Sequence, residues 1–119
     1  MPPLEQTIGK RFLSLLKERT KPLIVRAFGS RLRGDALQDS DFDVVVVIEI
    51  VDAALDKFIS ECAWEAGFEY GVIVSPLVYS RADYEREAAS PLLRAIEREG
   101  ETLLNETLYD KTSQGETTP

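Results

Sequence analysis

The sequence predicts one small α/β domain in which helices flank a short mixed β-sheet. Three observations lead to this prediction. The chain has 119 residues, which suffices for a single modest core. A run of five apolar residues at 44–48 is typical of a strand that is buried on both faces. Segments with apolar residues at helical spacing lie before and after this run, so helices and strands interleave along the chain.

The first predicted helix covers residues 4–16 and stops before Pro22. Its apolar positions, at helical spacing, are Leu4, Ile8, Phe12, Leu15 and Leu16. Residues 23–28 are rich in branched and aromatic side chains and end at Gly29, which predicts a first strand. The second strand is predicted over 42–51, and its apolar run places it in the middle of the sheet.

A second helix is predicted to begin at Asp52, which suits a helix N-cap, and to end near Gly67. Its apolar stripe is formed by Leu55, Phe58, Ile59, Cys62 and Ala66. Cys62 is therefore expected to pack in the core. Trp64 lies on the opposite face of this helix. Either it marks a partner surface, or it lies partly covered across neighbouring side chains.

The third strand is predicted over 72–79, where Pro76 indicates a bulge or an edge position. A capping-box-like spacing from Ser80 then opens a short helix, and Ser90 precedes a further helix that ends at Gly100. The domain is predicted to cover residues 1–104. The polar composition of 105–119 predicts a mobile C-terminal tail.

Composition excludes several classes of site. The chain has no histidine, which rules out a Ser-His-Asp or Cys-His catalytic arrangement and a histidine zinc site. A single cysteine allows no internal disulfide, and no secretory or transit segment opens the chain, so a cytoplasmic location is expected. The longest apolar run falls far short of the roughly 18 residues that a membrane span needs.

The charge is distributed unevenly. Residues 1–33 carry eight basic side chains against two acidic ones, whereas the remainder carries six against nineteen, for a net charge of -7. The acidic remainder argues against nucleic-acid binding. The basic first quarter either receives a small anion such as a nucleoside triphosphate or is the solvated face of a helix.

Two carboxylates stand at the head of the most apolar strand. Asp41 and Asp43 are two residues apart, so both project to the same side, within roughly 7 Å along the backbone. Such a pair can hold divalent metal for phosphoryl or nucleotidyl transfer, and Mg²⁺ is the natural choice. The alternative is that they only cap a turn or open a strand.

A possible phosphate-binding turn precedes this pair by ten residues. Gly29 permits close approach, while Ser30 offers a backbone N–H and a hydroxyl to phosphate oxygens. Arg31 and Arg33 would add positive charge, unless they are simply solvated. Ser40, most simply a turn residue, would support the site by hydrogen bonding. These five residues are the predicted nucleotide-binding set.

With Gly29-Ser30, ten residues, and Asp41-x-Asp43, the chain resembles the polymerase-beta-like nucleotidyltransferases, and most of all their minimal single-domain members. The resemblance extends from the first predicted helix to about residue 104. It implies the nucleotidyltransferase fold and a Mg²⁺-dependent transfer of a nucleoside monophosphate, AMP from ATP, to an acceptor hydroxyl with release of pyrophosphate. On the matching positions the two aspartates become catalytic metal ligands, and Gly29 and Ser30 become triphosphate contacts.

The resemblance also implies a partner. Minimal members are often encoded beside a HEPN-domain ribonuclease, which they are thought to neutralise, in some cases by modifying it with AMP. Such a partner would supply the acceptor hydroxyl in this toxin–antitoxin arrangement.

One feature departs from the family pattern. Active members usually carry a third carboxylate on a neighbouring strand, but residues 71–79 contain no acid. Glu49 and Glu69 are the candidate substitutes. Three functions therefore stay open: an active nucleotidyltransferase, a catalytically weak antitoxin that acts by protein contact, and a nucleotide or metal sensor that forms homo-oligomers.

Overall fold

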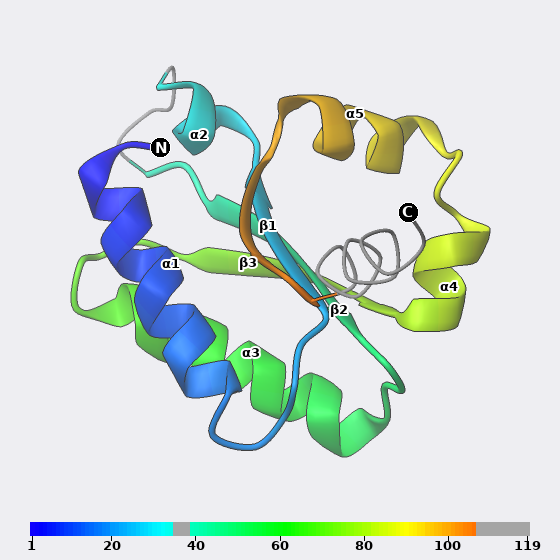
Figure 1. The fold of residues 1–119 in the computed structure, drawn as a ribbon. Helices are drawn as coiled ribbons and strands as arrows, with labels where there is room; N and C mark the ends of the chain where they lie inside the picture. The colour runs from blue at the N-terminus through cyan, green and yellow to red at the C-terminus, as the bar shows by residue number, and fades with distance from the viewer. Residues whose placement is uncertain (35–38, 107–119) are drawn as a thin grey trace, which may run out of the picture.

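The computed structural model describes residues 1–34 and 39–106 (Figure 1). In chain order its elements are α1 (Pro3–Leu16), β1 (Ile24–Phe28), α2 (Ser30–Arg33), β2 (Phe42–Ile48), α3 (Ala53–Phe68), β3 (Val74–Ser80), α4 (Arg81–Arg86), α5 (Pro91–Glu99) and β4 (Glu101–Asn105). Within these described residues, no helix combines the length and the apolarity that a membrane span requires.

The four strands form one mixed sheet in the order β3-β2-β1-β4. β1 is antiparallel to both β2 and β4, whereas β2 and β3 are parallel. The predicted interior position of β2 is confirmed, since its four valines are fully buried. Pro76 lies on β3 at the edge of the sheet, as predicted, because an edge strand leaves one row of N–H groups unpaired.

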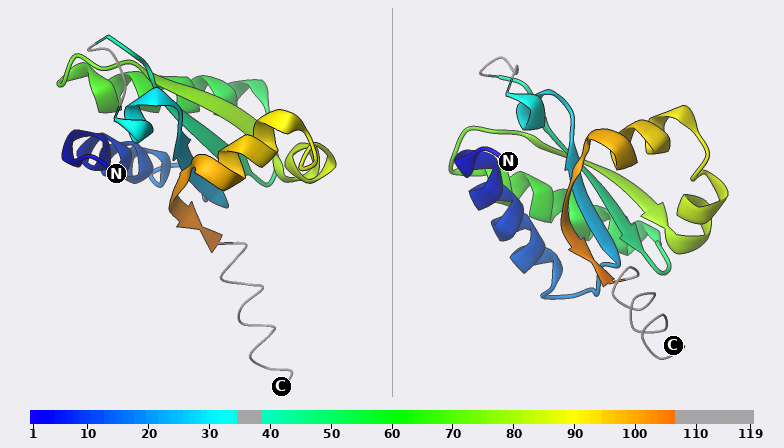
Figure 2. Two further views of the ribbon diagram at one scale, coloured as in Figure 1. Left: turned by 90° about the horizontal axis from the view of Figure 1, so that it is seen from above. Right: turned by 45° about the horizontal axis from the view of Figure 1, so that its top comes forward.

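The sheet separates two helical layers (Figure 2). α1 and α3 cover one face, where α1 buries Ile8, Phe12 and Leu16 completely. α4 and α5 lie on the opposite face, where Leu93 and Ile96 pack against Val45. The alternation of β2 therefore sends its even-numbered side chains towards α1 and α3, and its odd-numbered ones towards α5.

The predicted N-caps and the core position of Cys62 are confirmed, whereas α3 continues through Gly67 and its C-cap is Glu69. Asp52 accepts a hydrogen bond from the Leu55 N–H at 2.8 Å. Ser80 and Ser90 cap α4 and α5 in the same way. Cys62 is 4% exposed, and burial raises the pKa of its thiol to about 11.

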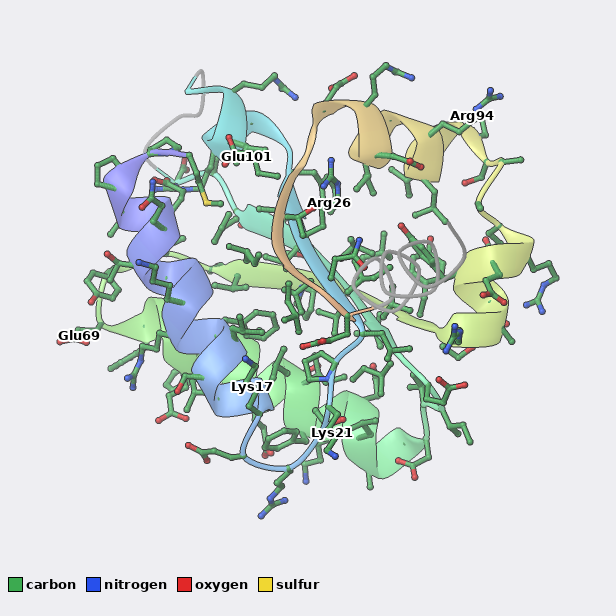
Figure 3. All side chains as sticks on the ribbon, viewed as in Figure 1. Lys17, Lys21, Arg26, Glu69, Arg94 and Glu101 are labelled. Carbon is green, nitrogen blue, oxygen red and sulfur yellow. The ribbon has the colours of Figure 1, made fainter. Side chains whose placement is uncertain are left out.

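Sequence reasoning missed two short elements, α2 and β4. β4 is a half-exposed edge strand without clear alternation, and a register shift interrupts its pairing with β1. Arg26 holds this region by donating to the carbonyl oxygens of Ile96, Glu97 and Gly100, at and just beyond the C-terminal end of α5 (Figure 3). β4 thus reaches one residue beyond the predicted domain boundary, and residues 107–119 of the predicted tail lie outside the described residues.

Candidate functional site

The Gly29 turn and the Asp43 carboxylate are in direct contact. Gly29 follows β1, and Asp43 pairs with Phe28 in the antiparallel register of β1 and β2. Gly29 has φ 91° and ψ -169°, a conformation that only glycine adopts readily. A Cβ at this position would lie 2.5 Å from Asp43 Oδ2. The structure thus brings together the two halves of the predicted site, with no room for a side chain between them.

Asp43 and Asp41 form a compact negative pair. Phe42 between them is fully buried on the α1/α3 side, so both carboxylates belong to the opposite face. Burial and the negative charge of Asp41 raise the pKa of Asp43. Among the described residues, neither carboxylate forms an ion pair. A half-buried acid beside a second acid is costly without a cation, and two hard oxygen donors fit Mg²⁺.

Ser30 and Arg33 lie on α2, immediately after Gly29. Ser30 is half-buried at the first position of this single helical turn, beside the Gly29–Asp43 contact, whereas the Arg33 side chain is exposed. Their predicted contacts with a triphosphate remain predictions. Lys17 caps the C-terminal end of α1 and Lys21 lies beyond it, at the end of the molecule opposite α2 (Figures 1 and 3). Both side chains are exposed, and neither adds positive charge close to this site.

Arg31 has structural partners. Its Nε donates to Glu5 Oε2 at 2.9 Å and its Nη1 donates to the carbonyl oxygen of Ser40 at 2.7 Å. The Arg31 and Glu5 side chains are only 10% and 8% exposed. Sequence reasoning missed Glu5, although a signal was present, because Glu5 stands at helical spacing before Ile8 and Phe12 on the apolar face of α1.

Among the described residues, no third carboxylate lies beside the pair. Ser75 is the residue of β3 that pairs with Asp43. Glu49 follows the far end of β2, roughly 20 Å along the strand, and pairs with Arg81 at 3.3 Å. Glu69 follows α3 and points outward, away from the sheet (Figure 3). Across residues 1–34 and 39–106, no group of three acidic or cysteine side chains is placed to hold a metal ion together.

Trp64 lies away from the carboxylates, on the exposed face of α3. It is 65% exposed and stacks on Phe68 with ring centroids 4.6 Å apart. Beside this pair, Ile73 and Pro76 help to line a cavity of about 470 Å³ between α3 and β3. The predicted orientation of Trp64 is confirmed, and its assignment to a partner surface stays a prediction.

Comparisons with known proteins agree with this architecture. The family model described as nucleotidyltransferase domain matches residues 10–101. A protein of Methanocaldococcus jannaschii, provisionally assigned as a protein adenylyltransferase, is 29% identical over 101 residues, which cover 83% of this chain and 97% of that protein.

Two solved structures share the fold. One is a crystal structure of a toxin–antitoxin with AMP-PNP, with a TM-score of 0.62 and 19% identity over 87% of this chain and 78% of the other. The second is a tri-AMPylated Shewanella oneidensis HEPN toxin in complex with an MNT antitoxin, with a TM-score of 0.58 and 18% identity over 91% and 78%. Because the family model spans well over half of the chain and includes the Gly29–Asp43 contact, this chain belongs to the nucleotidyltransferase domain family.

Proposed function

We propose that this protein is a Mg²⁺-dependent nucleotidyltransferase that moves AMP from ATP to a hydroxyl group of a HEPN-type toxin. The observation that carries the proposal is the contact between the Gly29 turn and Asp43, which lies beside Asp41. Such a turn can offer backbone N–H groups to phosphate oxygens, and two carboxylates can offer oxygens to a metal, which supports the proposal. The name of the M. jannaschii relative and the AMPylated HEPN toxin in a neighbouring structure support the acceptor class.

Each residue has a role in this proposal. Asp41 and Asp43 would hold the metal, which when bound would neutralise charge on the transferred phosphate. Ser30 donates its hydroxyl and backbone N–H to the triphosphate, and Arg33 adds positive charge. Gly29 lets the phosphates approach the carboxylates closely.

The acceptor oxygen attacks the α-phosphorus, the bond to pyrophosphate breaks, and the acceptor hydroxyl loses its proton. Ser75, which pairs with Asp43, has no carboxylate to take that proton. We assign this role to water or to a residue of the partner.

A second candidate function follows from the composition of β3. Without a third carboxylate, the chain is a catalytically weak antitoxin that neutralises its partner by contact. The absence of acids from β3 favours this reading.

Calorimetry tests the site first. The purified chain is titrated with ATP and with a non-hydrolysable analogue, with and without Mg²⁺, beside the Asp41→Asn/Asp43→Asn double variant. We expect saturable Mg²⁺-dependent binding that the double variant loses while it stays folded. Glu49→Gln/Glu69→Gln removes the same charge elsewhere and should bind like the wild type. Unchanged nucleotide affinity in the aspartate double variant would contradict the metal-site assignment.

Transfer of label separates the two candidate functions. The chain is incubated with ATP labelled in its α-phosphate and with a HEPN-domain protein as the acceptor. Mg²⁺-dependent label on that protein supports the enzyme, whereas neutralisation of the toxin without label supports the contact antitoxin.

A further inference from the structure

We infer that Arg31, held by Glu5, is a positioning residue that fixes the Ser40 peptide and thereby sets Asp41 beside Asp43. For its effect on metal and nucleotide, this inference rests on the proposed function.

The contacts of Arg31 join three segments. Arg31 lies on α2, its carboxylate partner Glu5 lies on α1, and Ser40, whose carbonyl accepts its second hydrogen bond, precedes β2. In Figure 1, the N-terminal part of α1 lies close to α2. One planar guanidinium can serve both oxygens at once because its N–H groups form a rigid fork, which the single ammonium of lysine does not offer.

Asp41 depends on this link for its position. It precedes β2 and is exposed, so the sheet does not hold it directly. On one side, Phe42 is anchored by its buried ring and by its N–H, which donates to the Ile73 carbonyl at 2.8 Å. On the other side, the Ser40 carbonyl is held by Arg31 at 2.7 Å. Asp41 thus lies between two residues that are held in place, Phe42 by the core and Ser40 by Arg31.

The charge of Glu5 also indicates a positioning role. Within the described part of the chain, Glu5 is the one charged residue that counts as buried, at 6% exposure. A buried ion pair is weak support for stability, because apolar residues of similar volume often replace it without loss. What an apolar pair cannot supply is a directed donor for the Ser40 carbonyl.

Two variants test the inference. Glu5→Met/Arg31→Met replaces the ion pair by apolar side chains, and Arg31→Lys keeps the charge for Glu5 but removes the fork. Arg11→Met is the matched control on α1, because it removes an exposed ion pair with Glu65 at 3.6 Å, far from the aspartates in the fold. The readouts are the melting temperature, hydrogen exchange of the Asp41 and Phe42 amides, and Mg²⁺-dependent ATP affinity.

We expect both test variants to fold, with faster exchange at 41–42 and affinity lowered about 10- to 100-fold, the usual range for a lost support of a metal ligand. Arg11→Met should match the wild type in all three readouts. Wild-type exchange at 41–42 in a folded Arg31→Lys variant would overturn the inference. If the variants exchange faster at 41–42 but the wild type binds no nucleotide, the positioning role is upheld and the proposed function is refuted.

Discussion

The substitution Gly29→Ala tests the contact on which the site depends. It adds a Cβ at a residue with φ 91° and ψ -169°. Holding alanine in this backbone region costs about 1–3 kcal/mol. The new Cβ would also stand 2.5 Å from Asp43 Oδ2, which is the free end of a short side chain, so the carboxylate turns away instead of the backbone moving.

Gly34→Ala is the matched control for this prediction. Gly34 also has a positive φ, 82°, but a Cβ there would meet no heavy atom of the described residues within 4 Å, apart from its chain neighbours. The left-handed conformation alone costs alanine about 1–2 kcal/mol. The two variants should therefore lose similar amounts of unfolding free energy, and only Gly29→Ala should also displace a metal ligand.

Urea unfolding and calorimetry separate these effects. We expect the unfolding free energy to fall by about 1–3 kcal/mol in Gly29→Ala and by about 1–2 kcal/mol in Gly34→Ala. Mg²⁺-dependent ATP binding should be lost in Gly29→Ala and kept in Gly34→Ala. Equal binding by both variants would refute the argument that the Gly29–Asp43 contact builds the site. Wild-type stability in Gly29→Ala would refute the geometry of the turn.

Three further predictions concern stability. Because burial and Asp41 raise the pKa of Asp43 above its ordinary value, folding loses stability as the pH rises through that folded-state pKa. The Asp43→Asn variant should not lose this stability, so at neutral pH without metal it should melt at a higher temperature than the wild type. An equal or lower melting temperature would contradict this prediction. Phe12→Ala should cost about 3–5 kcal/mol in urea unfolding because the ring is fully buried, whereas Leu4→Ala, at a 37% exposed residue, should stay within about 0.5 kcal/mol. Gly67→Ala should lower the melting temperature sharply, because its Cβ would lie 1.9 Å from the Val72 carbonyl oxygen, and a normal melting curve would exclude that close packing.

Local signals predicted most of the fold. The apolar spacing of α1, the Asp52 cap of α3 and the valines of β2 each act within a few residues, so each can be recognised without knowing the rest of the chain. α2 and β4 escaped recognition because they are short. In addition, β4 is held by pairing with β1, some eighty residues earlier in the chain.

The candidate site divides in the same way. The sequence by itself determined the family, the Gly29 turn and the Asp41–Asp43 pair, since residue types at fixed spacing carry that information. Only the tertiary structure decided that Arg31 faces Glu5 and that Ser75 stands beside Asp43. These placements depend on how α1 packs beside α2 and on how β3 aligns with β2, and packing between distant segments leaves no periodic mark in the sequence.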